Sequence, residues 1–167
     1  MAAAGQATGG AGGFTFDLVS PERRLSSLEA REVLLPGIEG DMTAMPGHAP
    51  TITTLRPGLL RVVHERGTEE FVVRGGFAEV TQTGVSVLAE QAFPRAEFTG
   101  EVHARLLEEA RTGLAAAQAV PDQPGPVDDA VRLLADMVAV GDHISIGAAP
   151  SRAPGWPQAP PARPTDM

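Results

Sequence analysis

The sequence predicts a mainly β fold: an antiparallel β-sandwich over residues 14–93, followed by a helical appendage over residues 94–146. Apolar and polar residues alternate in the first range, and glycine or proline interrupts the alternation at short intervals. This pattern is typical of half-buried strands in a sandwich or barrel. After Pro94 the apolar residues recur at helical spacing instead. A chain of 167 residues fits one domain with a small appendage.

The first strands are marked by their alternation and by the prolines that end them. Residues 14–18 alternate up to the break before Pro21, and a further strand ends with the apolar run 33–35 before Pro36. Proline favours such breaks because it has no amide hydrogen to donate within a sheet.

A turn and a hairpin are expected next. Pro57 and Gly58 occupy the two central positions of a type II turn, which requires a positive φ angle at Gly58. The strands Leu59–His64 and Glu69–Arg74 then flank the turn residues 65–68. Two more alternating segments, 77–81 and 85–89, follow at the spacing expected of a sandwich.

The first helix is predicted between Thr99 and Pro121. Thr99 is a suitable N-cap, because its hydroxyl oxygen accepts a hydrogen bond from a free amide of the first turn. Prolines exclude a helix through the segment that begins at Pro121. The apolar face of this helix consists of Val102, Leu106, Ala110, Leu114 and Ala117.

A second helix is predicted to start at the N-cap residue Asp128 and to end at Gly141, which gives a two-helix hairpin. Its apolar residues cover a broad stripe. The main face is Val131, Leu134 and Val138, and it is widened by Leu133, Met137 and Val140.

Both ends of the chain are expected to be disordered. The leader, residues 1–13, is rich in alanine and glycine and has neither the basic nor the hydrophobic segment of a signal peptide. The tail, residues 147–167, is rich in proline, and its Trp156 is expected to be exposed. No apolar run approaches the ~20 residues that span a bilayer, so direct membrane insertion is not expected.

The composition excludes several classes of function. The chain has no cysteine, which excludes disulfides, thiolate metal sites and cysteine nucleophiles. The formal net charge is −8, and the arginines are scattered singly apart from Arg23-Arg24. Because no basic stripe neutralises phosphates, nucleic acid and anionic membrane surfaces are not expected partners.

No arrangement of residues predicts catalysis, a cofactor or a metal ion. The histidines lack the spacing of a ligand motif, no serine lies in a G-x-S-x-G setting, and no glycine-rich loop leads into a helix. The acidic pairs Glu69-Glu70 and Glu108-Glu109 are adjacent in sequence, so their side chains diverge and are expected to be solvated. We therefore predict no catalytic, cofactor-binding or metal-binding residue.

The stretch TAMPGHAP, residues 43–50, encloses His48 between prolines. Such a frame suits a metal or acid–base site, a turn that only joins strands, or a surface presented to a partner. The first option lacks supporting residues, which leaves the turn and the surface. Proline reduces the entropy lost when a loop is held in one shape, which helps either role. A second unusual loop, PGIEGDMT at residues 36–43, is expected to lie beside it.

Three motifs follow one another in the strand region. They are PGHAP at residues 46–50, L-x-P-G-x-L-x-V at 55–62, and G-G-F-x-E-V-x-x-x-x-V-x-V-L-A-E at 75–90. Together they resemble the epsilon subunit of F-type ATP synthases over residues 14–93, and the helical hairpin is similar in outline. The resemblance implies a sandwich of about ten strands followed by two helices, in agreement with the change of period at Pro94.

The resemblance implies a non-catalytic rotor subunit in the central stalk of a proton-driven ATP synthase. In that family the sandwich binds the gamma subunit and rests on the ring of c subunits, at the cytoplasmic side of the bacterial cell inner membrane. The resemblance further implies that Glu39, Asp41 and His48 face the polar loops of the ring.

The helices depart from the family pattern. In many members they extend along gamma and restrain ATP hydrolysis, with basic residues against the catalytic alpha and beta subunits. Residues 97–142 here contain nine acidic residues and three arginines, so such inhibition is not expected. The family's ATP-binding pattern is met only loosely at residues 107–112, where Glu108 and Arg111 also fit a surface ion pair.

A different class of function is a free-standing sandwich that binds a small ligand or a sugar. Such modules usually present aromatic platforms. This chain has one tryptophan, in the tail, and no tyrosine, so the rotor-subunit interpretation is favoured.

Overall fold

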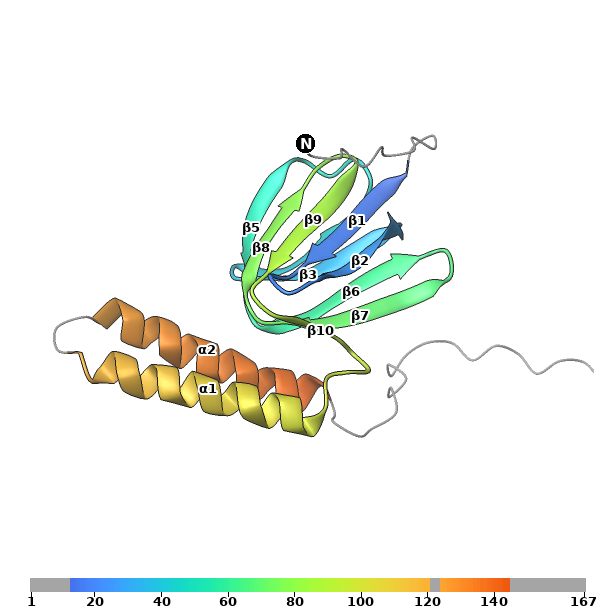
Figure 1. The fold of residues 1–167 in the computed structure, drawn as a ribbon. Coiled ribbons are helices and arrows are strands. Elements are labelled where there is room, and N and C mark those ends of the chain that lie inside the picture. The colour runs from blue at the N-terminus through green and yellow to red at the C-terminus, as the bar shows by residue number, and fades with distance from the viewer. Residues whose placement is uncertain (1–12, 121–123, 145–167) are drawn as a thin grey trace, which may run out of the picture.

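The computed structural model describes residues 13–120 and 124–144, which form ten strands and two helices (Figure 1). The predicted tail and all of the leader except Gly13 lie outside these residues. The mainly β architecture with a helical hairpin is confirmed. The strands are β1 (Phe14–Val19), β2 (Arg24–Ala30), β3 (Glu32–Gly37), β4 (Gly40–Ala44), β5 (Thr51–Leu55), β6 (Gly58–His64), β7 (Gly67–Val73), β8 (Gly76–Val80), β9 (Gly84–Ala89) and β10 (Ala92–Pro94).

The strands form one continuous sheet that folds over into two layers. The order is β10-β7-β6-β3-β5-β8-β9-β1-β2, and β4 pairs with β3 outside this path. The pairs are antiparallel except for β1 with β9. The layers meet where β3 pairs with β5 through Gly37 and Leu55 alone. Across the interior, the rings of Phe16 in β1 and Phe71 in β7 lie 6.4 Å apart.

The core between the layers is built from the inward residues of the alternating strands. Burial of these side chains away from water is the main favourable contribution to folding of the sandwich. The largest fully buried members are Phe16, Leu18, Leu35, Leu60, Val33, Val62, Val73, Val80 and Val87.

The segment PGIEGDMT is not a loop, as the sequence suggested, but most of a tight hairpin. β3 and β4 pair from Val33 with Ala44 to Gly37 with Gly40, and only two residues connect them. Gly40 has a φ angle of 134°, which suits a short turn that other residues adopt poorly. The two segments adjoin at Thr43 within β4, but the turn of the hairpin and the loop that contains His48 lie at opposite ends of this strand.

Gly58 is not the positive-φ residue of a type II turn. It is absent from the glycines at positive φ, and it already pairs with Val73 as the first residue of β6. A β-carbon at this position would lie 2.6 Å from Cβ of Pro36. Glycine is therefore required for close packing against Pro36 and not for its backbone conformation.

The helices are α1 (Gly100–Gln118) and α2 (Pro124–His143), and they lie antiparallel beneath β6, β7 and β10 (Figure 1). The predicted N-cap of α1 is confirmed, because the Thr99 hydroxyl accepts a hydrogen bond from the Val102 amide at 3.4 Å. Both predicted ends of α2 are wrong. The helix begins before Asp128, since prolines are tolerated in a first turn, and it continues past Gly141.

The face of α2 that packs is also different from the predicted main face. Val131 and Val138 are 49% and 45% exposed, whereas Met137 and Val140 are buried. The side chains expected only to widen the stripe therefore form its centre, because α1 and the sandwich lie on that side of the helix. This second core consists of Val72, Phe98, Leu106, Met137, Val140 and Ile144.

Gly141 allows α1 and α2 to approach closely. A β-carbon there would lie 2.3 Å from Cε1 of His103. The His103 ring also bonds through Nε2 to the Met137 carbonyl oxygen at 2.8 Å and lies 5.8 Å from the Phe98 ring. His103 therefore packs directly against Gly141, where a larger residue would not fit without a shift.

Candidate interaction surfaces

The free edge of β4 is the first candidate surface. Within the described residues β4 pairs only with β3, so its other edge has no strand partner. Glu39 is exposed in the turn before β4, and Asp41 is exposed near its start. The Asp41 carboxylate accepts a hydrogen bond from the Arg56 guanidinium at 2.6 Å, so its charge is already partly neutralised within the chain.

The loop that contains His48 lies beyond the other end of β4. The Gly47 amide donates to the carbonyl oxygen of Gln82 at 2.9 Å, which fastens the loop to the turn between β8 and β9. Gly47 has a φ angle of 83°, and the His48 amide donates back to the Met45 carbonyl oxygen at 3.0 Å. The loop is therefore a fixed turn with a half-buried histidine.

The three residues predicted to face a partner lie along one edge of the sheet and do not meet at one site. Glu39 and Asp41 lie at one end of β4, and His48 follows the other end. The 5 residues of β4 span about 17 Å at the usual rise of a strand. A flat partner lying along β4 would contact both ends, whereas a small ligand would not.

An apolar patch on the outer face of β5, β8 and β9 is the second candidate surface. Ile52, Phe77 and Leu88 are 74%, 57% and 59% exposed. Phe77 pairs with Leu88, and Leu88 pairs in turn with Val19 of β1, so these three side chains form a row across neighbouring strands. Ile52 lies diagonal to Phe77, because the β5 partner of Phe77 is Thr54. We call Ile52, Phe77 and Leu88 the apolar face.

The two outer faces of the sandwich differ in whether the helices pack on them. The helices pack on the face formed by β6, β7 and β10, while the apolar face lies in the other layer (Figure 1). Sequence reasoning missed this surface. The sequence nevertheless contained a signal. Phe77 and Leu88 occupy outward positions of their strands, next to the inward residues Ala78 and Val87, yet they are apolar.

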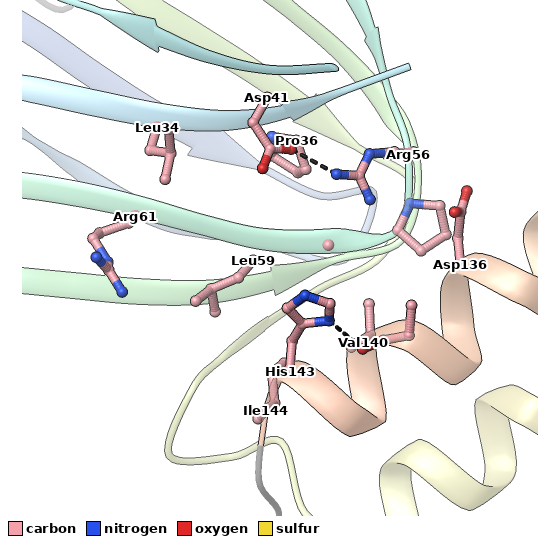
Figure 2. Close-up of a pocket in the computed structure, with 13 residues that line it drawn as sticks. Leu34, Pro36, Asp41, Arg56, Leu59, Arg61, Asp136, Val140, His143 and Ile144 are labelled. Carbon is pink, nitrogen blue, oxygen red and sulfur yellow. Dashed lines mark hydrogen bonds and ion pairs between the residues drawn. The ribbon is translucent and has the colours of Figure 1, made fainter. Parts of the chain in front are cut away.

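A cleft separates the sandwich from the C-terminal end of α2. It has a volume of about 330 Å³ and is lined by Asp41, Arg56 and Arg61 of the sandwich and by Asp136 and His143 of α2 (Figure 2). The floor is apolar, with Leu59, Val140 and Ile144. The Asp41 end of the β4 edge is thus adjacent to the helical hairpin.

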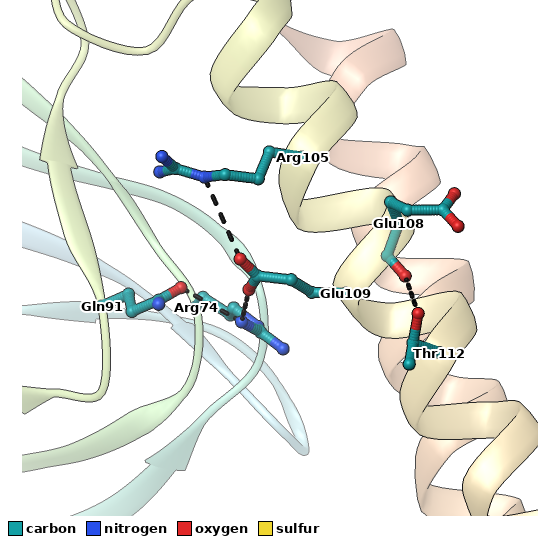
Figure 3. Close-up of polar contacts among 6 residues, drawn as sticks. All are labelled: Arg74, Gln91, Arg105, Glu108, Glu109 and Thr112. Carbon is teal, nitrogen blue, oxygen red and sulfur yellow. Dashed lines mark hydrogen bonds and ion pairs between the residues drawn. The ribbon is translucent and has the colours of Figure 1, made fainter.

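A polar contact on the other helix fastens the hairpin to the sandwich. Arg74, which directly follows β7, donates through Nη1 to the Glu109 carboxylate of α1 at 2.8 Å and to the Gln91 side-chain oxygen at 3.1 Å (Figure 3). The Arg74 side chain is only 19% exposed, so this pair is less screened than a surface pair. Glu108 and Arg111 lie 3.6 Å apart on the surface, as predicted for a plain ion pair.

The described residues contain no group of three or more acidic or histidine side chains able to hold a metal ion. Among the same residues, no helix is both long enough and apolar enough to cross a membrane.

Comparison with known proteins relates this chain to ATP synthase subunits. Residues 13–95 match the family model of the ATP synthase delta/epsilon chain β-sandwich domain. The chain is 57% identical to the ATP synthase epsilon chain of Ruegeria sp. (strain TM1040) over 131 residues, which are 78% of this chain and 96% of the relative. The epsilon chain of Rhodobacter capsulatus is 56% identical over the same shares of the two chains.

Among solved structures, a chain of the Euglena gracilis mitochondrial ATP synthase, described as OSCP/F1/c-ring in rotational state 1, is similar with a TM-score of 0.56. It is 26% identical, and the match covers 80% of this chain and 84% of that one.

Proposed function

The chain belongs to the epsilon-chain family of ATP synthases, and we propose that it is a non-catalytic rotor subunit in the central stalk of a proton-driven enzyme. The main support is its 57% identity to the Ruegeria epsilon chain across 96% of that relative. In this role it joins the gamma subunit to the ring of c subunits, so that proton flow is coupled to ATP synthesis. Family membership replaces the alternative of a free-standing ligand-binding module.

The apolar face is the proposed contact for gamma. The cores of protein interfaces are apolar and often contain aromatic side chains, and Phe77 and Leu88 offer such a centre. The opposite outer face is already covered by the chain's own helices. A gamma subunit seated here would cover the largest exposed apolar side chains of the sandwich.

The β4 edge is the proposed contact for the c-ring, through Glu39, Asp41 and His48. Charged and polar side chains at both ends of a strand suit a broad partner with polar loops. The Asp41–Arg56 pair presents a negative and a positive charge to that partner. Such charges fix the orientation of a bound partner more than they raise its affinity. A packed sandwich resists deformation, so torque applied along this edge is transmitted to gamma.

The helical hairpin is proposed to stay docked on the sandwich and not to reach the alpha and beta subunits. Its apolar side is buried in the second core, and Arg74 binds Glu109. The subunit is therefore expected to be peripheral, at the cytoplasmic side of the cell inner membrane, held there by its partners.

Affinity purification from membranes tests this role. A tagged full-length chain is expressed in its source bacterium, and the membranes are solubilised in mild detergent. Recovery of gamma, the c subunit and the catalytic subunits in fixed proportion is expected. Recovery of the tagged chain alone would contradict membership of the rotor.

A further inference from the structure

The cleft in Figure 2 brings one arginine close to two carboxylates from different parts of the fold. Arg56 precedes β6, Asp41 belongs to β4, and Asp136 belongs to α2. In the view of Figure 2, Arg56 lies between the two acids. The β4 edge is the proposed contact for the ring, and α2 belongs to the docked hairpin. The cleft therefore lies between the proposed ring contact and the hairpin.

The charged side chains of the cleft differ in whether they form an ion pair. Arg56 binds Asp41 at 2.6 Å, and the other arginine, Arg61, is held by Glu70 at 2.9 Å. Within residues 13–120 and 124–144, Asp136 forms no ion pair. His143 directs Nδ1 to the Ala139 carbonyl oxygen of its own helix at 2.8 Å. Among the described residues that line the cleft, Asp136 is therefore the carboxylate without an ion pair, and the Arg56 guanidinium lines the same cleft.

We propose that Arg56 is shared between Asp41 and Asp136 and couples contact at the β4 edge to docking of α2. The guanidinium binds Asp41 while this edge is free. A partner that engages the Asp41 carboxylate releases Arg56, which then binds Asp136 and holds the end of α2 more firmly against the sandwich. This inference rests on the proposed function for the identity of the partner, but not for the exchange of the arginine between acids.

The physical basis is that a guanidinium is always charged and is poorly accommodated without an acceptor. The Arg56 side chain is only 33% exposed, so losing Asp41 leaves a partly desolvated cation beside the apolar floor of the cleft. Asp136 is the other acid that lines the same space. By linkage, firmer docking of α2 must in turn free Asp41 for its partner.

Hydrogen–deuterium exchange of the α2 amides in the full-length chain tests the sharing without any partner. Asp41→Ala is expected to slow exchange in α2 by roughly two- to fivefold, the range of an exposed ion pair. Asp136→Ala alone is the reference for the double variant, because alanine itself favours the helix and slows exchange in α2 slightly. The double variant D41A/D136A should exchange no more slowly than D136A, and in D41A/R56Q the slowing should disappear.

A matched control is Glu65→Ala, which removes an exposed carboxylate from the ion pair with Arg31 outside the cleft. Exchange in the α2 amides should not respond to it, and the β6 and β7 amides report whether any variant has disturbed the sandwich. Exchange of α2 in D41A that is as fast as in the parent or faster, or exchange in D41A/D136A that is slower than in D136A, would overturn the sharing of Arg56.

A second measurement uses purified c-ring in detergent. Binding of the ring to the unaltered chain should slow exchange in α2, whereas D136A should bind the ring equally well without slowing. A ring that binds without affecting α2 contradicts the coupling. A ring that does not bind contradicts the proposed ring contact, and the comparison of D41A with D41A/D136A then still decides whether Arg56 is shared.

Discussion

At the residue scale, the sequence pointed to Gly58 as a position that requires glycine, but the reason it suggested was wrong. A proline–glycine pair is the usual sign of a type II turn, and the prediction of positive φ followed from it. The structure instead places Gly58 at the start of a strand, with the Pro36 ring against its α-carbon. The need for glycine arises from a contact with a residue far away in the sequence.

Gly58→Val is expected to lower the free energy of unfolding by about 1–3 kcal/mol, the usual effect of overpacking. The added side chain must displace Pro36 and thereby the end of β3. Thermal unfolding measures the loss. Gly113→Ala is the control: it adds a methyl group in open space on α1 and should raise stability slightly. Equal melting temperatures for Gly58→Val and the parent would show that Pro36 moves aside freely.

Asp41→Arg is expected to weaken retention of the subunit on c-ring membranes by roughly 1–3 kcal/mol. The substitution removes the carboxylate proposed to face the ring and places a second cation beside Arg56. The sandwich should remain folded, because Asp41 is exposed. Co-sedimentation with membranes measures retention, and unchanged sedimentation would mean that this end of β4 faces elsewhere.

The helices show at the element scale where a periodic pattern is ambiguous. α2 has apolar residues on more than one side, and either set satisfies the spacing of an amphipathic helix. The hairpin buries the side that carries Met137 and leaves Val131 and Val138 half exposed. Spacing alone does not choose between two overlapping faces, because the choice depends on where the neighbouring helix and sheet lie.

Gly141→Ala is expected to destabilise the hairpin by about 1–3 kcal/mol. The new methyl group overlaps the His103 ring, which must leave its hydrogen bond to the Met137 carbonyl oxygen. Chemical unfolding monitored by helix content measures the change. Because the cause is steric, the double variant H103A/G141A should be less destabilised than the two single variants combined.

Phe77→Ser is expected to weaken gamma binding at least tenfold while changing stability by less than about 1 kcal/mol. The side chain is 57% exposed on the apolar face, so the fold depends on it little. Binding to purified gamma is measured by calorimetry. Val131→Ser removes a similarly exposed apolar side chain from α2 and should leave gamma affinity unchanged. Equal loss in both variants would argue against the apolar face.

At the scale of the whole molecule, the two outer faces of the sandwich and the free edge of β4 have different surroundings. The hairpin covers one face, the apolar side chains remain uncovered on the other, and β4 forms the polar edge between them. This asymmetry allows one rigid sandwich to contact two partners without competition. The helices then serve as a fixed cover, fastened by Arg74 and Glu109.

A chain that ends after Arg95 keeps all ten strands and is expected to bind gamma and support coupled synthesis. ATP hydrolysis by the reconstituted complex should rise by less than about twofold, because this acidic hairpin has few of the basic residues that the family pattern places against the catalytic subunits. Steady-state hydrolysis at low and high ATP measures the effect. A several-fold rise on truncation would show that the hairpin inhibits despite its charge.

The sequence by itself determined the fold class, the change from strands to helices at Pro94, the N-cap at Thr99 and, through its motifs, the family. These features depend on residues that are close together in the chain, because alternation and capping are local properties. Only the tertiary structure decided which face of α2 is buried, which sheet face stays uncovered, and that Asp41, Arg56 and Asp136 line one cleft. Such contacts join segments far apart in sequence, and strand register and layer packing set them.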